Sequence, residues 1–147
     1  MLRQTIDGNI LTYKHDKKII ICHQTNCKTT NPKGLSKSIF DKYPEVNIYT
    51  QNRTPGEIIF KKTNDNKIIA NMNAQNYPGK PLYETKEYRI ELFKKCIQQL
   101  EEFVNDDYIC LFPIGIGCGL AGGDWQEYYK IINNSKIPDI IFINYKV

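Results

Sequence analysis

Four short apolar runs recur along the chain, and each is too short to form a helix of ordinary length. All four are rich in isoleucine, and they cover residues 19–22, 68–70, 109–112 and 140–143. Continuous apolar runs, as opposed to alternating ones, are typical of strands that are covered by helices on both faces. We therefore predict that these segments form the centre of a mainly parallel sheet.

Three further segments have the composition of strands, at residues 2–6, 10–13 and 57–61. The last of them leads into Asn64-Asp65-Asn66, which is a turn sequence typical of a hairpin. We expect these three strands to extend the sheet beyond its apolar centre.

Helical periodicity is present in three segments. Apolar side chains four residues apart predict a helix over residues 35–43, which Pro44 ends. A longer apolar stripe predicts a helix over residues 84–104, and another predicts a helix over residues 125–132. Asp124 directly precedes the last stripe, where a helix N-cap belongs.

The predicted strands and helices alternate along the chain. Alternation of this kind implies right-handed crossovers and a mainly parallel sheet with helices on both faces. Because 147 residues are an ordinary length for one domain, we predict a single α/β domain over residues 1–147. In such folds ligands bind beyond the carboxyl ends of the strands, where residues 23–34 and 113–124 fall.

Charge and cysteine content narrow the classes of partner and site. The net charge is +4, and the lysines are scattered, which leaves nucleic-acid binding open but does not support it. The five cysteines include no C-x-x-C pair, and only two histidines accompany them, so we predict no metal site and no cofactor.

The same composition bears on location. The odd number of cysteines and the lack of a signal peptide predict an intracellular protein of the cytoplasm or nucleus. No apolar run approaches the ~20 residues that a membrane span needs, so we expect no membrane association. We also expect a monomer.

The strongest local motif is PIGIGCGLAGGDW at residues 113–125, in which five of the nine glycines fall within nine positions. Successive amides just before a helix N-terminus form a nest for a phosphate or diphosphate. The motif lacks the Gly-Lys-Ser/Thr of a Walker loop, and it comes too late in the chain for a dinucleotide fingerprint. A tight turn without a ligand is the alternative, although so many glycines cost conformational entropy that packing seldom explains.

Polar side chains follow two of the central strands. His23 follows the first apolar run and has two interpretations, a general acid or base and a hydrogen-bonded structural histidine. Asn26 either donates to a ribose hydroxyl or caps a turn, and Asp124 either caps a helix, positions water, or does both. Asn71 and Gln75 either line a cleft or belong to a polar segment through which the chain leaves its strand and enters a loop.

Together these motifs resemble those of macrodomains, an α/β/α family that binds ADP-ribose, over almost the whole chain. The turn at Asn9 and the side chain of Tyr145 resemble the family's adenine contacts, and Asn26 resembles its contact to the distal ribose. Residues 113–125 resemble its diphosphate loop. The resemblance implies ligand contacts from Asn9, Ile10, Asn26, Gly34, Asn71, Gln75, Gly115, Ile116, Gly117, Cys118, Gly119, Leu120, Gly122 and Tyr145.

Within the family, the His23-x-x-Asn26-Cys27 sequence is similar to that of the ADP-ribose 1''-phosphate phosphatases of fungal and viral type. This implies a hydrolase that removes the 1'' substituent of ADP-ribose derivatives, with His23 and Asp124 as the catalytic pair. A non-catalytic ADP-ribose reader, a hydrolase of mono-ADP-ribosyl or O-acetyl-ADP-ribose, and a module for RNA or a partner protein are the alternatives.

The sequence also departs from the family pattern. Lys28–Lys33 replaces the three consecutive glycines that usually contact the distal ribose, and Asn9 stands where an aspartate usually binds adenine. A related branch uses a lysine where this chain has Met72 and Asn73, and an aspartate where it has Ala121. The lysine-dependent covalent route of that branch is therefore not predicted.

Overall fold

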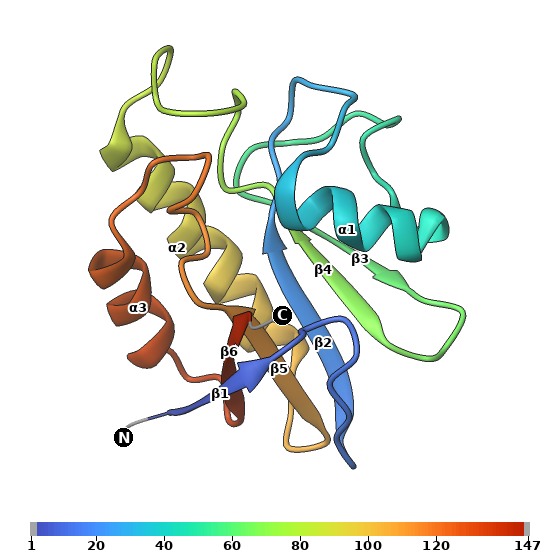
Figure 1. The fold of residues 1–147 in the computed structure, drawn as a ribbon. Coiled ribbons are helices and arrows are strands. Elements are labelled where there is room, and N and C mark those ends of the chain that lie inside the picture. The colour runs from blue at the N-terminus through green and yellow to red at the C-terminus, as the bar shows by residue number, and fades with distance from the viewer. Residues whose placement is uncertain (1–2, 146–147) are drawn as a thin grey trace.

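The computed structural model describes residues 3–145, which form one six-stranded sheet (Figure 1). The strand order is β1-β6-β5-β2-β4-β3, and every pair is parallel except the antiparallel pair β3 and β4. The strands are β1 (Gln4–Gly8), β2 (Lys18–Gln24), β3 (Ile58–Lys62), β4 (Ile68–Met72), β5 (Tyr108–Pro113) and β6 (Ile140–Tyr145). The prediction of a mixed, mainly parallel α/β sheet is confirmed.

Helices cover both faces of this sheet and give three layers (Figure 1). Side chains of α2 (Lys86–Phe103) and α3 (Trp125–Asn133) share one apolar core with the sheet. Side chains of α1 (Gly34–Lys42) and the 3₁₀ helix η1 (Pro44–Val46) form the second core on the opposite face. In β2, Ile20 belongs to the first core and Ile21 to the second. A strand buried on both faces needs apolar residues at consecutive positions, which is why the isoleucine-rich runs mark the central strands.

The strand predicted over residues 10–13 is wrong, because these residues form a turn after β1. The Asn9 side-chain oxygen accepts from the amide of Leu11 at 2.9 Å, and the Asn9 carbonyl accepts from the amide of Tyr13. Such local bonds from asparagine compete with the sheet ladder and favour a turn. The strand expected over residues 2–6 begins at Gln4 and continues to Gly8, while its first predicted residue lies outside the described range.

The remaining boundaries differ from the predictions by one or two residues. The α2 helix begins at Lys86 because Thr85 is its N-cap, with the Thr85 hydroxyl accepting from the amide of Tyr88. The hairpin between β3 and β4 turns at Asn66, whose φ of 72° is the left-handed conformation that asparagine tolerates. Within residues 3–145, no helix combines the length and the hydropathy needed to cross a membrane.

Candidate functional site

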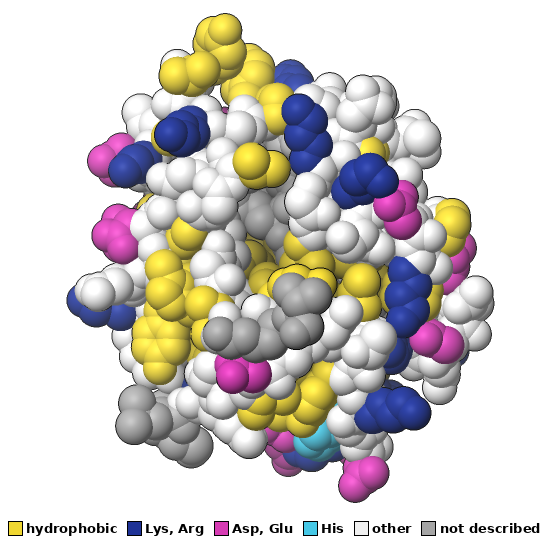
Figure 2. Space-filling view, viewed as in Figure 1, with side chains coloured by type: hydrophobic (Ala, Val, Ile, Leu, Met, Phe, Trp, Pro, Cys, Tyr) yellow, Lys and Arg dark blue, Asp and Glu magenta, His cyan; other side chains and the backbone are white. Residues whose placement is uncertain are grey.

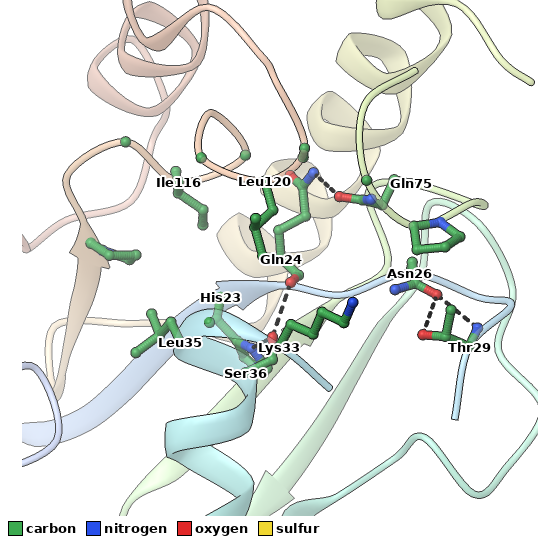
Figure 3. Close-up of a pocket in the computed structure, with 18 of the residues that line it drawn as sticks. His23, Gln24, Asn26, Thr29, Lys33, Leu35, Ser36, Gln75, Ile116 and Leu120 are labelled. Carbon is green, nitrogen blue, oxygen red and sulfur yellow. Dashed lines mark hydrogen bonds between the residues drawn. The ribbon is translucent and has the colours of Figure 1, made fainter. Parts of the chain in front are cut away.

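A pocket of about 760 Å³ opens where the polypeptide leaves β2 and β5, and the first turn of α1 forms one of its walls (Figure 3). This volume is within the range of known small-molecule sites. On the face shown in Figure 2, Lys and Arg side chains are spread over the surface and form no continuous stripe. The pocket therefore suits a small anionic ligand better than an extended polyanion.

The glycine loop that follows β5 supplies one wall of the pocket. Four of its five glycines fall into two groups, according to what a side chain would meet, while a Cβ at Gly122 would lie 3.1 Å from the Lys80 side chain. A Cβ at Gly117 or Gly123 would lie 2.9 or 2.6 Å from the ring of Tyr128, so these positions hold the loop against α3. A Cβ at Gly115 or Gly119 would meet nothing within 4 Å, and both residues line the pocket. The second group leaves backbone open to a ligand.

The N-terminus of α1 supplies the opposite wall. Its N-cap residue, Lys33, makes no side-chain cap hydrogen bond, and the first turn contains no acidic residue. Lys33, Gly34, Leu35 and Ser36 all line the pocket. The first amides of a helix have no intrahelical acceptor, and the helix dipole adds positive potential there. Two sets of backbone amides thus face the same pocket, which is a favourable arrangement for a diphosphate.

His23 lies at the base of the pocket, and only 1% of its surface is exposed. Its Nδ1 lies 2.9 Å from the Ser36 hydroxyl, and its Nε2 lies 2.6 Å from the Asn71 side-chain oxygen. Burial lowers the pKa of His23 to about 4, although the hydrogen bond to Asn71 opposes this shift. The ring is therefore neutral at pH 7, and both of its nitrogens are already hydrogen-bonded to the protein.

The predicted catalytic pair is not assembled at the pocket. Asp124 is exposed, and its side chain caps α3 by accepting from the amide of Gln126 at 3.0 Å. His23 lines the pocket, whereas Asp124 does not. Helix capping, one of the two predicted roles, thus accounts for an aspartate at this position after the glycine loop.

Asn26 lines the pocket but also organises the loop between β2 and α1. Its side-chain oxygen accepts from the amides of Lys28 and Thr29 and from the Thr29 hydroxyl. Its side-chain nitrogen Nδ2 donates to the Tyr49 hydroxyl at 3.4 Å, which is a long hydrogen bond that a ligand could replace.

The structure brings most of the other predicted contacts to the pocket. Those that line it are His23, Asn26, Gly34, Gln75, Gly115, Ile116, Gly117, Gly119 and Leu120. Those outside the lining are Asn9, Ile10, Asn71, Cys118, Gly122, Asp124 and Tyr145. The Asn9 side chain is engaged in its own turn, Ile10 is buried in the second core, and Asn71 lies behind His23. Tyr145 is 64% exposed and pairs with Gly8 across β1 and β6, beside the Asn9 turn.

Arg89 was missed entirely by the sequence predictions. This buried α2 residue donates to the Glu84 carboxylate at 2.7 Å and to the carbonyls of Tyr77, Gly79 and Ala121. Gly79, in the segment after β4, and Ala121, in the glycine loop, both line the pocket. Arg89 therefore ties the segment after β4 to the glycine loop. No local signal marks it, because an arginine in an amphipathic helix is ordinarily solvent-exposed.

Gln24, Ser36 and Tyr49 also line the pocket and were not predicted. Gln24 follows His23 in β2 and donates to the Gln75 side chain at 2.7 Å. Its place after a candidate site residue, at the end of a central strand, was the one available signal.

No protein-family model matches the chain, and no curated protein matches it. Several solved structures do match the chain. A protein of unknown function from Bacteroides thetaiotaomicron is 22% identical, with a TM-score of 0.83 over 98% of both chains. A macrodomain protein from Streptomyces coelicolor is 16% identical, with a TM-score of 0.74 over 96% of this chain and 98% of that one. The chain has the macrodomain fold.

A third solved structure that matches the chain contains a ligand. Thermosipho africanus DarTG, solved in complex with ADP-ribose, is 15% identical with a TM-score of 0.66. The match covers 87% of this chain and 38% of that one.

Proposed function

We propose that this protein binds ADP-ribose, or a derivative substituted at the 1'' position, in the 760 Å³ pocket. One observation carries the proposal: the uncapped N-terminus of α1 and the open glycines of the loop after β5 face the same cavity. Backbone amides from two sides can bind a diphosphate without a lysine-bearing phosphate loop. The ADP-ribose complex of Thermosipho africanus DarTG, in which 38% of the chain matches this fold, supports this choice of ligand.

The pocket suggests an orientation for the ligand. We place the diphosphate between the N-terminus of α1 and the amides of Gly115 and Gly119, and the distal ribose beside Asn26 and Tyr49. The adenine then extends toward the carboxyl ends of β1 and β6, where the Asn9 turn and Tyr145 lie.

Removal of a 1'' substituent, most specifically the phosphate of ADP-ribose 1''-phosphate, is the second candidate function. The observation that favours it is the presence of His23 in the pocket lining. Proton transfer by His23 would require one ring nitrogen to exchange Ser36 or Asn71 for the ligand. Because both nitrogens are engaged and Asp124 lies outside the lining, binding without turnover is the function that this geometry supports best.

Isothermal titration calorimetry with ADP-ribose tests the binding proposal. Saturable heat with ADP-ribose and none with adenosine is the expected result, because the diphosphate makes the proposed anchoring contacts. Absence of binding at millimolar ADP-ribose would refute it.

Phosphate release from ADP-ribose 1''-phosphate separates the two functions. A reader releases no phosphate above the uncatalysed rate. Release that His23→Ala abolishes would support the phosphatase, while release that persists in this variant would exclude His23 as its catalytic residue.

A further inference from the structure

The Ser36 hydroxyl lies at the base of the pocket, and a buried chain of hydrogen bonds fixes the direction of its proton. The chain begins at Asn71, whose amide nitrogen donates to the Ile59 carbonyl at 3.0 Å. The other end of this side-chain amide, its oxygen, therefore faces His23 Nε2 at 2.6 Å. The opposite orientation of the amide would set two acceptor oxygens 3.0 Å apart. Since an amide oxygen only accepts, the proton of the His23 ring is on Nε2.

The other ring nitrogen is then an acceptor. Burial keeps the His23 ring neutral, because it lowers the pKa to about 4, so Nδ1 has no proton at pH 7. The Ser36 hydroxyl lies 2.9 Å from Nδ1 and donates to it. The Gln24 carbonyl is a more distant acceptor for the same hydroxyl, at 3.4 Å. A serine hydroxyl has one proton and two lone pairs. The proton is directed to His23, and the Tyr49 hydroxyl is a hydrogen-bond partner for one lone pair, so Ser36 has one lone pair left for a ligand.

We propose that Ser36 is a specificity-determining residue that accepts a hydrogen bond from a hydroxyl of the distal ribose. The inference rests on the proposed function. Ser36 lines the same pocket as Asn26 and Tyr49, where we place that ribose, and Tyr49 accepts from the Asn26 backbone amide at 3.3 Å. A sugar hydroxyl can donate to Ser36. A phosphate oxygen has no proton to donate at this site and is repelled by an oxygen that presents only lone pairs.

His23 acts in this scheme as a positioning residue. It does not contact the ligand, and it holds the Ser36 proton away from the pocket. The order Ser36, His23, Asn71 is that of nucleophile, base and orienting residue, but a base with a pKa of about 4 is poorly matched to catalysis near pH 7. Hydroxyl recognition, not nucleophilic attack, is the role that this arrangement supports.

Calorimetry with two ligands tests the inference. ADP-ribose contains the distal ribose, and ADP lacks it. In Ser36→Ala we expect the affinity for ADP-ribose to fall about 2- to 10-fold, the worth of one hydrogen bond, and the affinity for ADP to stay unchanged. Ser38→Ala is the matched control, because Ser38 is in the same helix but is exposed and lies outside the pocket lining.

The outcomes distinguish the two proposals. If the wild-type protein binds neither ligand, the proposed function fails. If the wild type binds both but Ser36→Ala weakens both equally, or weakens neither, the assignment of Ser36 to the ribose is overturned.

The direction of the hydrogen bond between Ser36 and His23 can be tested separately. Nitrogen-15 NMR of the histidine rings is expected to show His23 protonated on Nε2 and not on Nδ1 between pH 6 and pH 8. A protonated Nδ1 would overturn the inference, whatever the calorimetry shows. The contact with Asn71 is enough to impose this tautomer, so the spectrum tests the direction of the Ser36 proton, and the calorimetry tests its role in binding.

Discussion

Replacement of Arg89 by methionine tests whether the buried ion pair stabilises the loops around the pocket. Arg89 and Glu84 have side chains that are only 2% and 5% exposed, and their closest atoms are 2.7 Å apart. Methionine fills much of the volume but leaves the Glu84 carboxylate buried without its cation. Breaking a buried pair from one side costs about 3–5 kcal/mol. For a chain of this length, that loss corresponds to a Tm lower by about 6–20 °C.

Urea denaturation followed by circular dichroism measures the change in the free energy of unfolding. Lys37→Met is the matched control, because Lys37 pairs with Asp41 on the exposed face of α1 and such pairs contribute less than about 1 kcal/mol. The double variant Arg89→Met/Glu84→Gln is expected to be less destabilised than the sum of the two single variants, since it buries no uncompensated charge. A loss below about 1 kcal/mol in Arg89→Met, with an unchanged m-value, would refute the reasoning.

Two further predictions concern the glycine loop and the buried histidine. Gly119→Ala should leave the free energy of unfolding nearly unchanged and weaken ADP-ribose binding. Gly117→Ala should destabilise the fold by about 1–3 kcal/mol, because the φ of Gly117 is 75° and its Cβ would meet Tyr128. Equal stabilities of the two variants in urea denaturation would contradict this prediction. For His23, the folded pKa of about 4 is below the unfolded value of about 6.5, so the unfolded chain binds a proton first as the pH falls. Stability should therefore fall by about 2 kcal/mol between pH 7 and pH 5 in the wild type relative to His23→Gln, and parallel losses in both proteins would contradict the assignment.

The sheet could be predicted from the sequence because burial on both faces leaves a local pattern. Residues 19–22 and 109–112 are continuous apolar runs, and both became central strands, β2 and β5. The exception is residues 10–13, which are apolar except for Thr12, but Asn9 satisfies the backbone locally and forms a turn. A periodicity argument does not weigh one side chain that competes for the backbone hydrogen bonds.

The site was less predictable, because its defining contacts join residues that are distant in sequence. His23 meets Ser36 thirteen positions later and Asn71 forty-eight positions later, and the second contact depends on the register between β2 and β4. Arg89 reaches the Ala121 carbonyl across thirty-two positions. The sequence identified His23 as notable but left two roles open, and only the positions of both partners favour the structural one.

The glycine loop shows why residue type alone does not define a binding surface. The resemblance implies ligand contacts from Gly115, Gly117, Gly119 and Gly122 alike. In the structure, however, Gly117 and Gly123 pack on Tyr128, while Gly115 and Gly119 face open space. The first group, together with the bond from Arg89 to the loop, fixes the backbone before any ligand arrives. A loop that is already ordered pays little conformational entropy on binding, so more of the amide–diphosphate interaction appears as affinity. Weakening the Arg89 anchor should therefore reduce ADP-ribose affinity even though Arg89 itself lies outside the pocket lining.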